Sequence, residues 1–368
     1  MIRYFLRRLL YAFPILIGVN LITFFLFFVV NTPDNMARIH LGVKHVTPAA
    51  IEQWKVEHGY DKPLFFNREQ SGAKSITDTL FVDRSLKLFA FDFGKADDGR
   101  DIARDIKTRM WPSLAIALPV FAIGLMVNIT AALLIIFYRG TRLEYAGVIG
   151  LIALMSVSGL FYIIAGQYFI AKLWQWLPIS GYDDGLDAFK FILLPVLVSV
   201  GAGIGSGARW YRTIFLEETG KDYVRTARAK GLSELRVLFR HVLKNGMIPI
   251  LTGAVVVLPL LFTGSLVTES FFGIPGLGSY TIDAIRAQDF AIVQAMVFLG
   301  SALYIVGLLL TESFFGIPGL GSYTVDAIQA QDFAVVRAMV FLGSLLYIVG
   351  LMLTDISYAL ADPRVRLG

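Results

Sequence analysis

Long apolar runs, separated by polar segments, dominate the chain. Seven runs contain no charged side chain and cover residues 9–30, 110–138, 145–171, 191–208, 245–268, 290–311 and 338–354. A helix needs about 20 apolar residues to cross a bilayer, because it rises about 1.5 Å per residue and the hydrocarbon layer is about 30 Å thick. Each run is therefore a candidate spanning helix, the last being the shortest. The pattern predicts an all-α polytopic membrane protein.

Two polar segments interrupt this pattern. Residues 31–109 form either a packing lid on the outer face or a docking surface for a partner; within them, Thr47 and Pro48 predict a helix start, because Thr is a good N-cap and Pro suits the first helical position. Residues 209–244 carry nine Lys or Arg and four acidic residues. We expect a cytoplasmic N-terminus with a first spanning helix in 1–30, an extracytoplasmic segment in 31–109, a transmembrane core in 110–354 and a tail in 355–368.

Loop charges orient the chain in the membrane. Arg3, Arg7 and Arg8 precede the first run, and positively charged ends and short loops stay in the cytoplasm. Alternating crossings then place the loop 139–142 and the segment 209–244 on the cytoplasmic side as well. The first run is too long for a signal peptide and lacks a small-residue cleavage site, so we expect an uncleaved first helix.

Composition agrees with a membrane location and limits the chemistry. Hydrophobic residues make up 56% of the chain, charged residues make up 17%, and the mean hydropathy is +0.66. The net charge of +5 does not indicate a nucleic-acid partner, because the Lys and Arg residues fall mainly between apolar runs. The sequence has no cysteine, no zinc-type spacing of its four histidines and no Gly-x-x-x-x-Gly-Lys-Ser/Thr loop. We therefore expect no catalytic residue, no metal and no cofactor in this chain.

Two polar or small-residue features within the runs have structural explanations. Four glycines alternate from Gly201 to Gly207, but their spacing lacks the dinucleotide-binding fingerprint and favours close helix packing. Asn20, Asn128 and Gln167 lie at membrane depth, where they either line a path or hydrogen-bond across helices. No acidic residue falls inside the confident spans, which argues against a proton-driven carrier.

The cytoplasmic segment after the fourth run carries the most specific pattern. Small Ala227 and Ala229 allow another surface to approach, and Gly231 permits a sharp bend between two short helices. A basic stretch then continues to Pro249. We expect a helix-turn-helix, joined to spanning helices at both ends, that transmits force from a soluble partner.

At these residues the chain resembles the permease subunits of the dipeptide and oligopeptide ABC importer family. The cytoplasmic loop of that family has the form Tyr-x-x-x-Ala-x-Ala-Lys-Gly, and the matching residues here are Tyr223, Ala227, Ala229, Lys230 and Gly231. A following Arg-His-x-x-x-Asn run is matched by Arg240, His241 and Asn245. Arg225 replaces the Glu that opens the motif of the broader importer class, as is usual in the peptide branch.

Further elements similar to this family follow in order along nearly the whole chain. They are Arg7-Arg8-Leu9-Leu10 with Pro14, Gly59-Tyr60-Asp61-Lys62-Pro63-Leu64, Phe91-Asp92-Phe93-Gly94, Leu177-Pro178 with Ser180-Gly181-Tyr182, Pro275-Gly276-Leu277-Gly278, and Asp355-Ile356 with Asp362-Pro363-Arg364. Each element is weak alone, whereas the ordered set is specific.

The resemblance implies a type I ABC importer transmembrane fold in a bacterial inner membrane. The residues that it implies as the ATPase-coupling site are Tyr223, Ala227, Ala229, Lys230, Gly231, Leu232 and Ser233. The implied partners are a second permease subunit, two ATPase subunits that bind ATP and Mg²⁺, an extracytoplasmic solute-binding protein and membrane lipid. The implied function is import of di- or oligopeptides by alternating access. A related importer for nickel, glutathione or oligosaccharide is an alternative, and so is a membrane-anchored binding or signalling protein.

A tandem repeat occupies the C-terminal part of the chain. Residues 268–310 and 311–353 differ at only six of 43 positions, whereas the family has one such element, a bent external segment followed by the last helix. Seven crossings would place the tail outside. Its Arg364 and Arg366 instead favour the cytoplasmic side, where positively charged ends stay. We therefore expect six core crossings, with one repeat copy re-entrant, peripheral or stacked outside the bundle.

Overall fold

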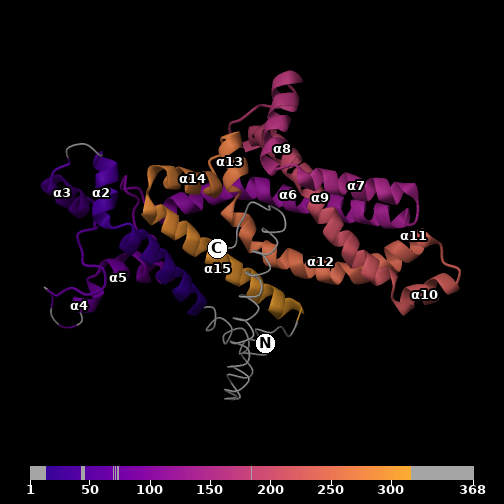
Figure 1. Ribbon diagram of the computed structural model, residues 1–368, viewed down its shortest axis with the longest axis horizontal. Helices are drawn as coiled ribbons and strands as arrows, with labels where there is room; N and C mark the ends of the chain where they lie inside the picture. Colours follow the sequence, from indigo (N-terminus) through magenta and orange to yellow (C-terminus); the bar gives the residue numbers. More distant parts are fainter. Residues whose placement is uncertain are drawn as a thin grey trace, which may run out of the picture. The chain divides into compact units, whose positions relative to one another are not determined.

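The computed structural model describes residues 14–42, 46–68, 70, 72, 74–183 and 185–315, and its regular structure over those residues is helical (Figure 1). The β-type pairing in this part of the chain is an isolated bridge between Lys95 and Asp101. The chain divides into two compact units, Met1–Thr311 and Glu312–Gly368. The all-α class expected from the sequence is therefore confirmed for the described residues.

Within the described residues, four stretches are long and apolar enough to cross a membrane. They are Ile102–Phe137 (α6), Ala188–Thr219 (α9), Glu234–Thr263 and Phe290–Thr311. The third stretch consists of α11 (Glu234–Val237), η5 (Leu238–Val242), α12 (Leu243–Val257) and η6 (Pro259–Thr263), and the fourth lies in α15 (Phe290–Phe315). Two bent helix pairs raise the candidate spans among the described residues from four to six, if each pair is one span. The expected run 338–354 lies outside the described residues.

The first bent pair begins the described chain. Its first helix runs from Pro14 to Val30 and ends in the π-helical segment η1 (Phe25–Val30). The second helix, α2 (Pro33–Leu41), follows at 60° to the first. The Thr32 side chain caps α2 by accepting a hydrogen bond from the Asn35 backbone N–H at 3.4 Å.

The second bent pair corrects the expectation of one straight helix over 145–171. The chain instead forms α7 (Arg142–Ser156), followed at 88° by α8 (Gly159–Gly166) and η3 (Gln167–Leu173). Val157 and Ser158 are extended at the break. The Tyr162 hydroxyl donates to the Leu154 carbonyl oxygen at 2.7 Å, which satisfies an acceptor at the end of α7.

The run 245–268 also ends in a bend. Gly264 has a φ of 72°, which is open to glycine and costly for other residues. Beyond it, Ser265 caps α13 (Leu266–Phe272), and α14 (Leu277–Ala287) follows after a short turn. These two helices form the α13–α14 hairpin, which precedes α15 in the chain. A short 3-10 turn, η4 (Gly185–Asp187), similarly leads into α9.

The polar segment 31–109 folds into short helices around an aromatic core. The predicted helix start is confirmed, because α3 (Pro48–His58) begins after Thr47, whose hydroxyl accepts from the Ala50 N–H at 3.3 Å. The remaining helices of the segment are α4 (Lys74–Thr77), α5 (Leu80–Arg84) and η2 (Leu86–Ala90). Trp54 and Leu80 pack with Phe28 of the N-terminal helix, which ties the segment to the first candidate span.

Close contacts between helices use glycine, as the sequence predicts. A Cβ at Gly205 in α9 would lie 2.6 Å from the backbone nitrogen of Met155 in α7, and a Cβ at Gly207 would overlap the Asn128 side chain of α6. Gly201 and Gly203 have no such neighbour within 4 Å. Two of the four alternating glycines therefore have the expected packing role.

A buried polar cluster joins the N-terminal helix, the segment 31–109 and α15. Asn20, Ser85 and Gln294 are at most 3% exposed. The Asn20 Nδ2 donates to the Ser85 carbonyl oxygen at 2.8 Å, and the Gln294 Nε2 donates to Ser85 Oγ at 3.1 Å and to Asn20 Oδ1 at 3.4 Å. Asn20 therefore hydrogen-bonds across elements, one of the two interpretations that its sequence position allowed.

Candidate functional site

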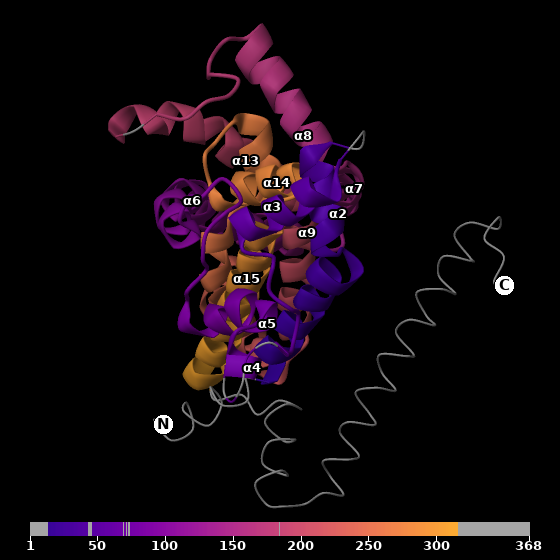
Figure 2. The ribbon, with the colours of Figure 1, turned by 90° about the vertical axis from the view of Figure 1, so that its left-hand side faces the viewer.

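The segment after α9 has the predicted helix-turn-helix form. α10 (Asp222–Ala229) is followed by a turn in which Gly231 has a φ of 76°, and α11 then begins the next candidate span. The turn is closed by the Lys230 N–H, which donates to the Thr226 carbonyl oxygen at 3.0 Å. Figure 1 places α10 and α11 at one end of the first unit and α2–α5 at the other, and Figure 2 looks at the α2–α5 end.

α10 is fixed to the helices around it by one apolar face. Val224 and Ala227, three positions apart, are 0% and 4% exposed. They belong to a buried cluster with Leu133 of α6, Phe215 of α9 and Leu238 of η5. α10 is therefore packed directly against α6, α9 and η5, and such closely packed interiors transmit strain.

The two small residues of the predicted site have different surroundings. Ala227 is buried against its own chain, whereas Ala229 is exposed. The small Ala227 side chain thus allows α10 to approach α6, α9 and η5 closely. Only Ala229 of this pair lies on a surface that another protein can reach.

Polar contacts anchor the start of α10. The Tyr223 hydroxyl donates to the Glu218 carboxylate at the end of α9, and Lys221 forms an ion pair with the same carboxylate. Burial, with the neighbouring Glu218 carboxylate, raises the pKa of Tyr223 to about 12. The nearby Asn245 side chain opposes this rise in the pKa of Tyr223, and its Nδ2 donates to the His241 carbonyl oxygen at 3.0 Å. The two matched motifs, around Tyr223 and around Asn245, therefore meet in space.

The outer side of the turn is cationic. Arg228 and Glu234 form a two-bond ion pair across it, with Nε and Oε2 3.1 Å apart, while Arg225, Lys230 and Ser233 are exposed. A groove of about 510 Å³ lies beside the turn and is lined by Tyr223, Thr226, Ala227, Lys230, Leu232, Arg236, Arg240 and His241. No carboxylate is among these lining residues, so the groove suits an acidic surface.

The structure thus brings together most of the predicted coupling residues and adds others. The groove is also lined by residues that were not among the seven coupling residues, namely Thr226, Arg236, Arg240 and His241. Helical spacing could have identified Thr226, because Tyr223, Thr226 and Lys230 follow i, i+3 and i+7. Among the described residues, no group of His, Cys, Asp or Glu has the form of a metal site.

Comparison with known proteins gives matches over nearly the whole chain. A family model described as "Binding-protein-dependent transport system inner membrane component" matches residues 108–313 and again 305–367, and a model for the N-terminal part of such membrane components matches residues 1–86. A protein of Brucella abortus (strain 2308), provisionally named as a permease of a peptide transport system, is 31% identical over 302 residues, covering 80% of this chain and 91% of that protein.

Two relatives carry the name dipeptide transport system permease protein DppB. The protein of Escherichia coli (strain K12) is 27% identical over 333 residues, covering 83% of this chain and 94% of the relative. The protein of Alkalihalophilus pseudofirmus is 27% identical over 338 residues, covering 83% and 95%. The chain therefore belongs to the family of inner membrane components of binding-protein-dependent transport systems, as a multi-pass permease.

Proposed function

We propose that this chain is one permease subunit of an ATP-driven importer for di- or oligopeptides, and that Tyr223–Ser233 contacts a partner ATPase. The observation that carries this proposal is the placement of α10. One side of the helix is buried against α6, α9 and η5, and the other side presents Arg225, Ala229 and Lys230. The peptide cargo is supported by the names of the relatives.

The proposed mechanism is mechanical. ATP and Mg²⁺ bind to two partner ATPase subunits, whose closure pushes α10, and α10 moves the ends of α6, α9 and α12 with it. A second permease subunit completes the path, and an extracytoplasmic binding protein delivers the solute on the side of segment 31–109. Gly246 supports this coupling, because a Cβ there would lie 2.6 Å from the Phe215 ring, so α12 and α9 are in direct contact.

The proposed topology has a cytoplasmic N-terminus, six core spans and a cytoplasmic tail. Two observations favour the first repeat copy, 268–310, as the core element. Gln294 of this copy hydrogen-bonds to Asn20 and Ser85, whereas the second copy has Arg337 at the corresponding position. The first copy also follows the bend at Gly264, whereas α15 continues without a break into the start of the second copy, to Phe315.

Reconstitution tests the proposed function. The chain is purified with its native partners, placed in liposomes with the binding protein, and assayed for ATP-dependent uptake of labelled trialanine, with nickel and glutathione as competing cargoes. Gly231→Val should abolish uptake, because a β-branched residue is strained at a φ of 76°. Gly150→Val is the matched control, since a Cβ at the exposed Gly150 meets nothing within 4 Å.

Two results would contradict the proposal. One is purification of the intact chain without any ATPase. The other is equal uptake by the Gly231→Val and Gly150→Val complexes, because the turn between α10 and α11 would then not transmit force.

A further inference from the structure

The α13–α14 hairpin separates two hollows of different character. An inner cavity of about 630 Å³ is mainly apolar and is lined by residues of α6, α8, α9 and η6, together with Thr268 and Glu269 of α13. An outer cleft of about 390 Å³ is lined mainly by charged and polar residues, among them Tyr280 and Asp283 of α14 and several residues of segment 31–109. The hairpin is therefore the partition between the cavity and the cleft.

One buried carboxylate lies at the centre of this partition. Glu269 is 1% exposed, and its two oxygens accept hydrogen bonds from the Ser265 and Ser279 backbone N–H groups, each at 3.0 Å. Burial raises the pKa of Glu269, while these two hydrogen bonds and the neighbouring Ser113 hydroxyl and Gly278 N–H act in the opposite direction.

The Ser113 hydroxyl connects the carboxylate to α6. Its oxygen also accepts from the Leu277 N–H, the first residue of α14, at 2.7 Å. Ser113 is itself 0% exposed. One side chain of α6 therefore contacts both the carboxylate of α13 and the backbone of α14.

Groups of this chain surround the Glu269 carboxylate. Two backbone N–H groups donate to its oxygens, and a Cβ at Gly276 would overlap both the carboxylate and Ser113 Oγ, so the Ser113 side chain lies beside it. Among the described residues, no Lys or Arg pairs with the carboxylate. The geometry is thus that of an internal tie, although Glu269 borders the inner cavity.

Two glycines provide the space for this carboxylate. A Cβ at Gly264 or at Gly276 would overlap its oxygens. Gly276 has a φ of −94°, which any residue adopts, so space and not backbone conformation requires glycine there. An Ala at Gly276 consequently displaces the carboxylate without altering any polar group.

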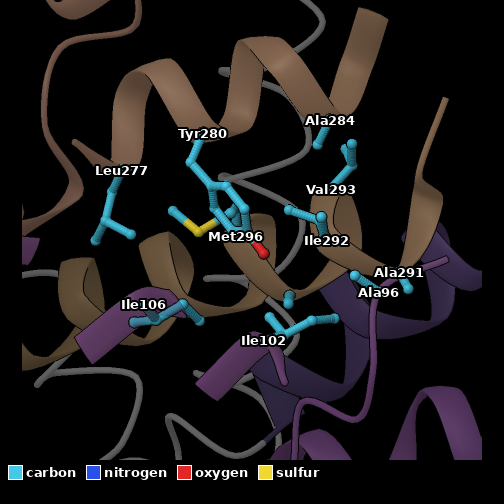
Figure 3. Close-up of a cluster of buried hydrophobic side chains, with 11 residues drawn as sticks. Ala96, Ile102, Ile106, Leu277, Tyr280, Ala284, Ala291, Ile292, Val293 and Met296 are labelled. Carbon is cyan, nitrogen blue, oxygen red and sulfur yellow. The ribbon is translucent and has the colours of Figure 1, made fainter. Parts of the chain in front are cut away.

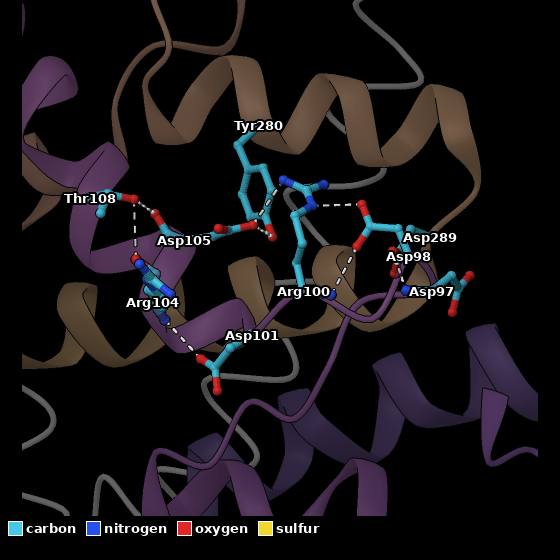
Figure 4. A network of polar contacts seen from close by, with 9 residues as sticks. All are labelled: Asp97, Asp98, Arg100, Asp101, Arg104, Asp105, Thr108, Tyr280 and Asp289. Atoms are coloured by element: carbon cyan, nitrogen blue, oxygen red, sulfur yellow. Dashed lines mark hydrogen bonds and ion pairs between the residues drawn. The ribbon is translucent and has the colours of Figure 1, made fainter. Parts of the chain in front are cut away.

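The outer side of the hairpin is held by separate contacts. Leu277 and Tyr280 pack against Ile102 and Ile106 at the start of α6 (Figure 3). The Tyr280 hydroxyl donates to Asp105 at 3.1 Å, in a network that also contains Arg100 (Figure 4). These contacts hold α14, whereas the Glu269 tie holds the junction of α13 and α14 deeper along α6.

We propose that Glu269 is a positioning residue that locks the α13–α14 hairpin to α6, so that the partition moves as one piece with α6 during transport. This proposal rests on the proposed permease function. Without the tie, the outer contacts still hold α14 to α6, but the junction of α13 and α14 no longer follows α6 closely, so fewer solute molecules pass for each ATP hydrolysed.

The test compares transport with hydrolysis in the reconstituted complex. In Glu269→Gln, an NH₂ group faces backbone N–H donors, and we expect the maximal uptake rate of trialanine to fall about tenfold or more, because the ties of a buried charged group are lost. ATP hydrolysis and the KM for loaded binding protein should stay within about twofold of the wild type. Glu269→Asp should recover part of the uptake, and Asp187→Asn, at an exposed carboxylate, should match the wild type.

Two outcomes would overturn the proposal. Unchanged uptake per ATP in Glu269→Gln removes the positioning role. A raised KM with an unchanged maximal rate instead makes Glu269 a contact for the binding protein or the solute.

A distance measurement keeps the test independent of transport. Because the chain has no cysteine, spin labels can be placed at the exposed residues Lys107 of α6 and Arg286 of α14. We expect one narrow distance distribution in the wild-type complex, with and without ATP, and a broadened one in Glu269→Gln and in Gly276→Ala. In a chain that already carries Glu269→Ala, Gly276→Ala should not broaden the distance distribution further.

Identical narrow distributions in all variants would refute the lock, even if the complex transports no peptide. If the wild-type complex imports no peptide but the distance distributions broaden in the variants as expected, only the proposed function is refuted.

Discussion

The repeat allows a comparison between two chains of equal length. Deleting 311–353 leaves the first copy joined to the native tail, and deleting 268–310 leaves the second copy between the same neighbours. The two products differ at six positions. Four differences exchange one apolar side chain for another, and a fifth falls at the exposed Arg286. The sixth places Arg337 where Gln294 hydrogen-bonds to Asn20 and Ser85.

The size of the effect follows from the burial of that site. Gln294 is 2% exposed and Ser85 is 0% exposed, and the hydrogen-bond partners of Gln294 are neutral. An unpaired charge in such a site costs several kcal/mol after relaxation, and we take about 3 kcal/mol, or a factor of about a hundred in the folded population. We therefore expect the chain with Arg337 to melt about 5 °C or more below the chain with Gln294.

Thermal unfolding of the two purified complexes, followed by gel filtration after heating, measures this difference. Gln294→Arg in the first-copy chain should reproduce the loss, and Arg337→Gln in the second-copy chain should remove it. Equal melting of the two single-copy chains, or higher stability of the chain with Arg337, would refute the assignment of the first copy to the core.

Three further predictions concern α10 and the helices packed against it. Ala227→Leu should overpack the buried cluster, lower the stability of the fold by about 1–3 kcal/mol and release α10, so that less ATPase is recovered on pull-down. Ala229→Leu should leave the melting temperature unchanged and weaken only ATPase binding. Gly246→Ala should lower the melting temperature by contact with Phe215, and Phe215→Leu should partly restore it. The pKa of Tyr223 is raised to about 12 from 10. Its hydrogen bond to the Glu218 carboxylate should therefore stabilise the complex fully below about pH 10, and this stabilisation should be lost as the pH rises towards 12. The difference in melting temperature between wild type and Tyr223→Phe should be constant from pH 7 to 9 and shrink above pH 10.

Hydrophobic patterning predicted the long helices well, because the bilayer imposes a minimum length on any spanning helix. The helix start after Thr47 and the turn at Gly231 were also predictable, since capping and positive φ depend on local residue type. The bends at Val157 and Gly264 were not predictable in this way. Both lie within uninterrupted apolar runs, where hydropathy does not change at the bend.

The candidate site shows the same division between local and distant contacts. The motif around Tyr223 located the coupling segment. It did not show that Ala227 is buried and Ala229 exposed, because this difference comes from contacts of Ala227 with α6 and α9. Glu269 received no role from the sequence, because the groups around its carboxylate belong to residues 113, 265, 278 and 279. Such a set becomes visible only after the hairpin has folded against α6.

Site-directed crosslinking tests the central claim, that Tyr223–Ser233 contacts an ATPase, most directly. In this cysteine-free chain, a single cysteine at Arg225 or Ala229 carries a short photoactivatable reagent in the complex purified with its partners. We expect crosslinks from both positions to an ATPase subunit, with yields that change on ATP binding, and none from a cysteine at Glu52 in segment 31–109. Absence of ATPase crosslinks at both positions, or equal yields from Glu52, would rule out this contact.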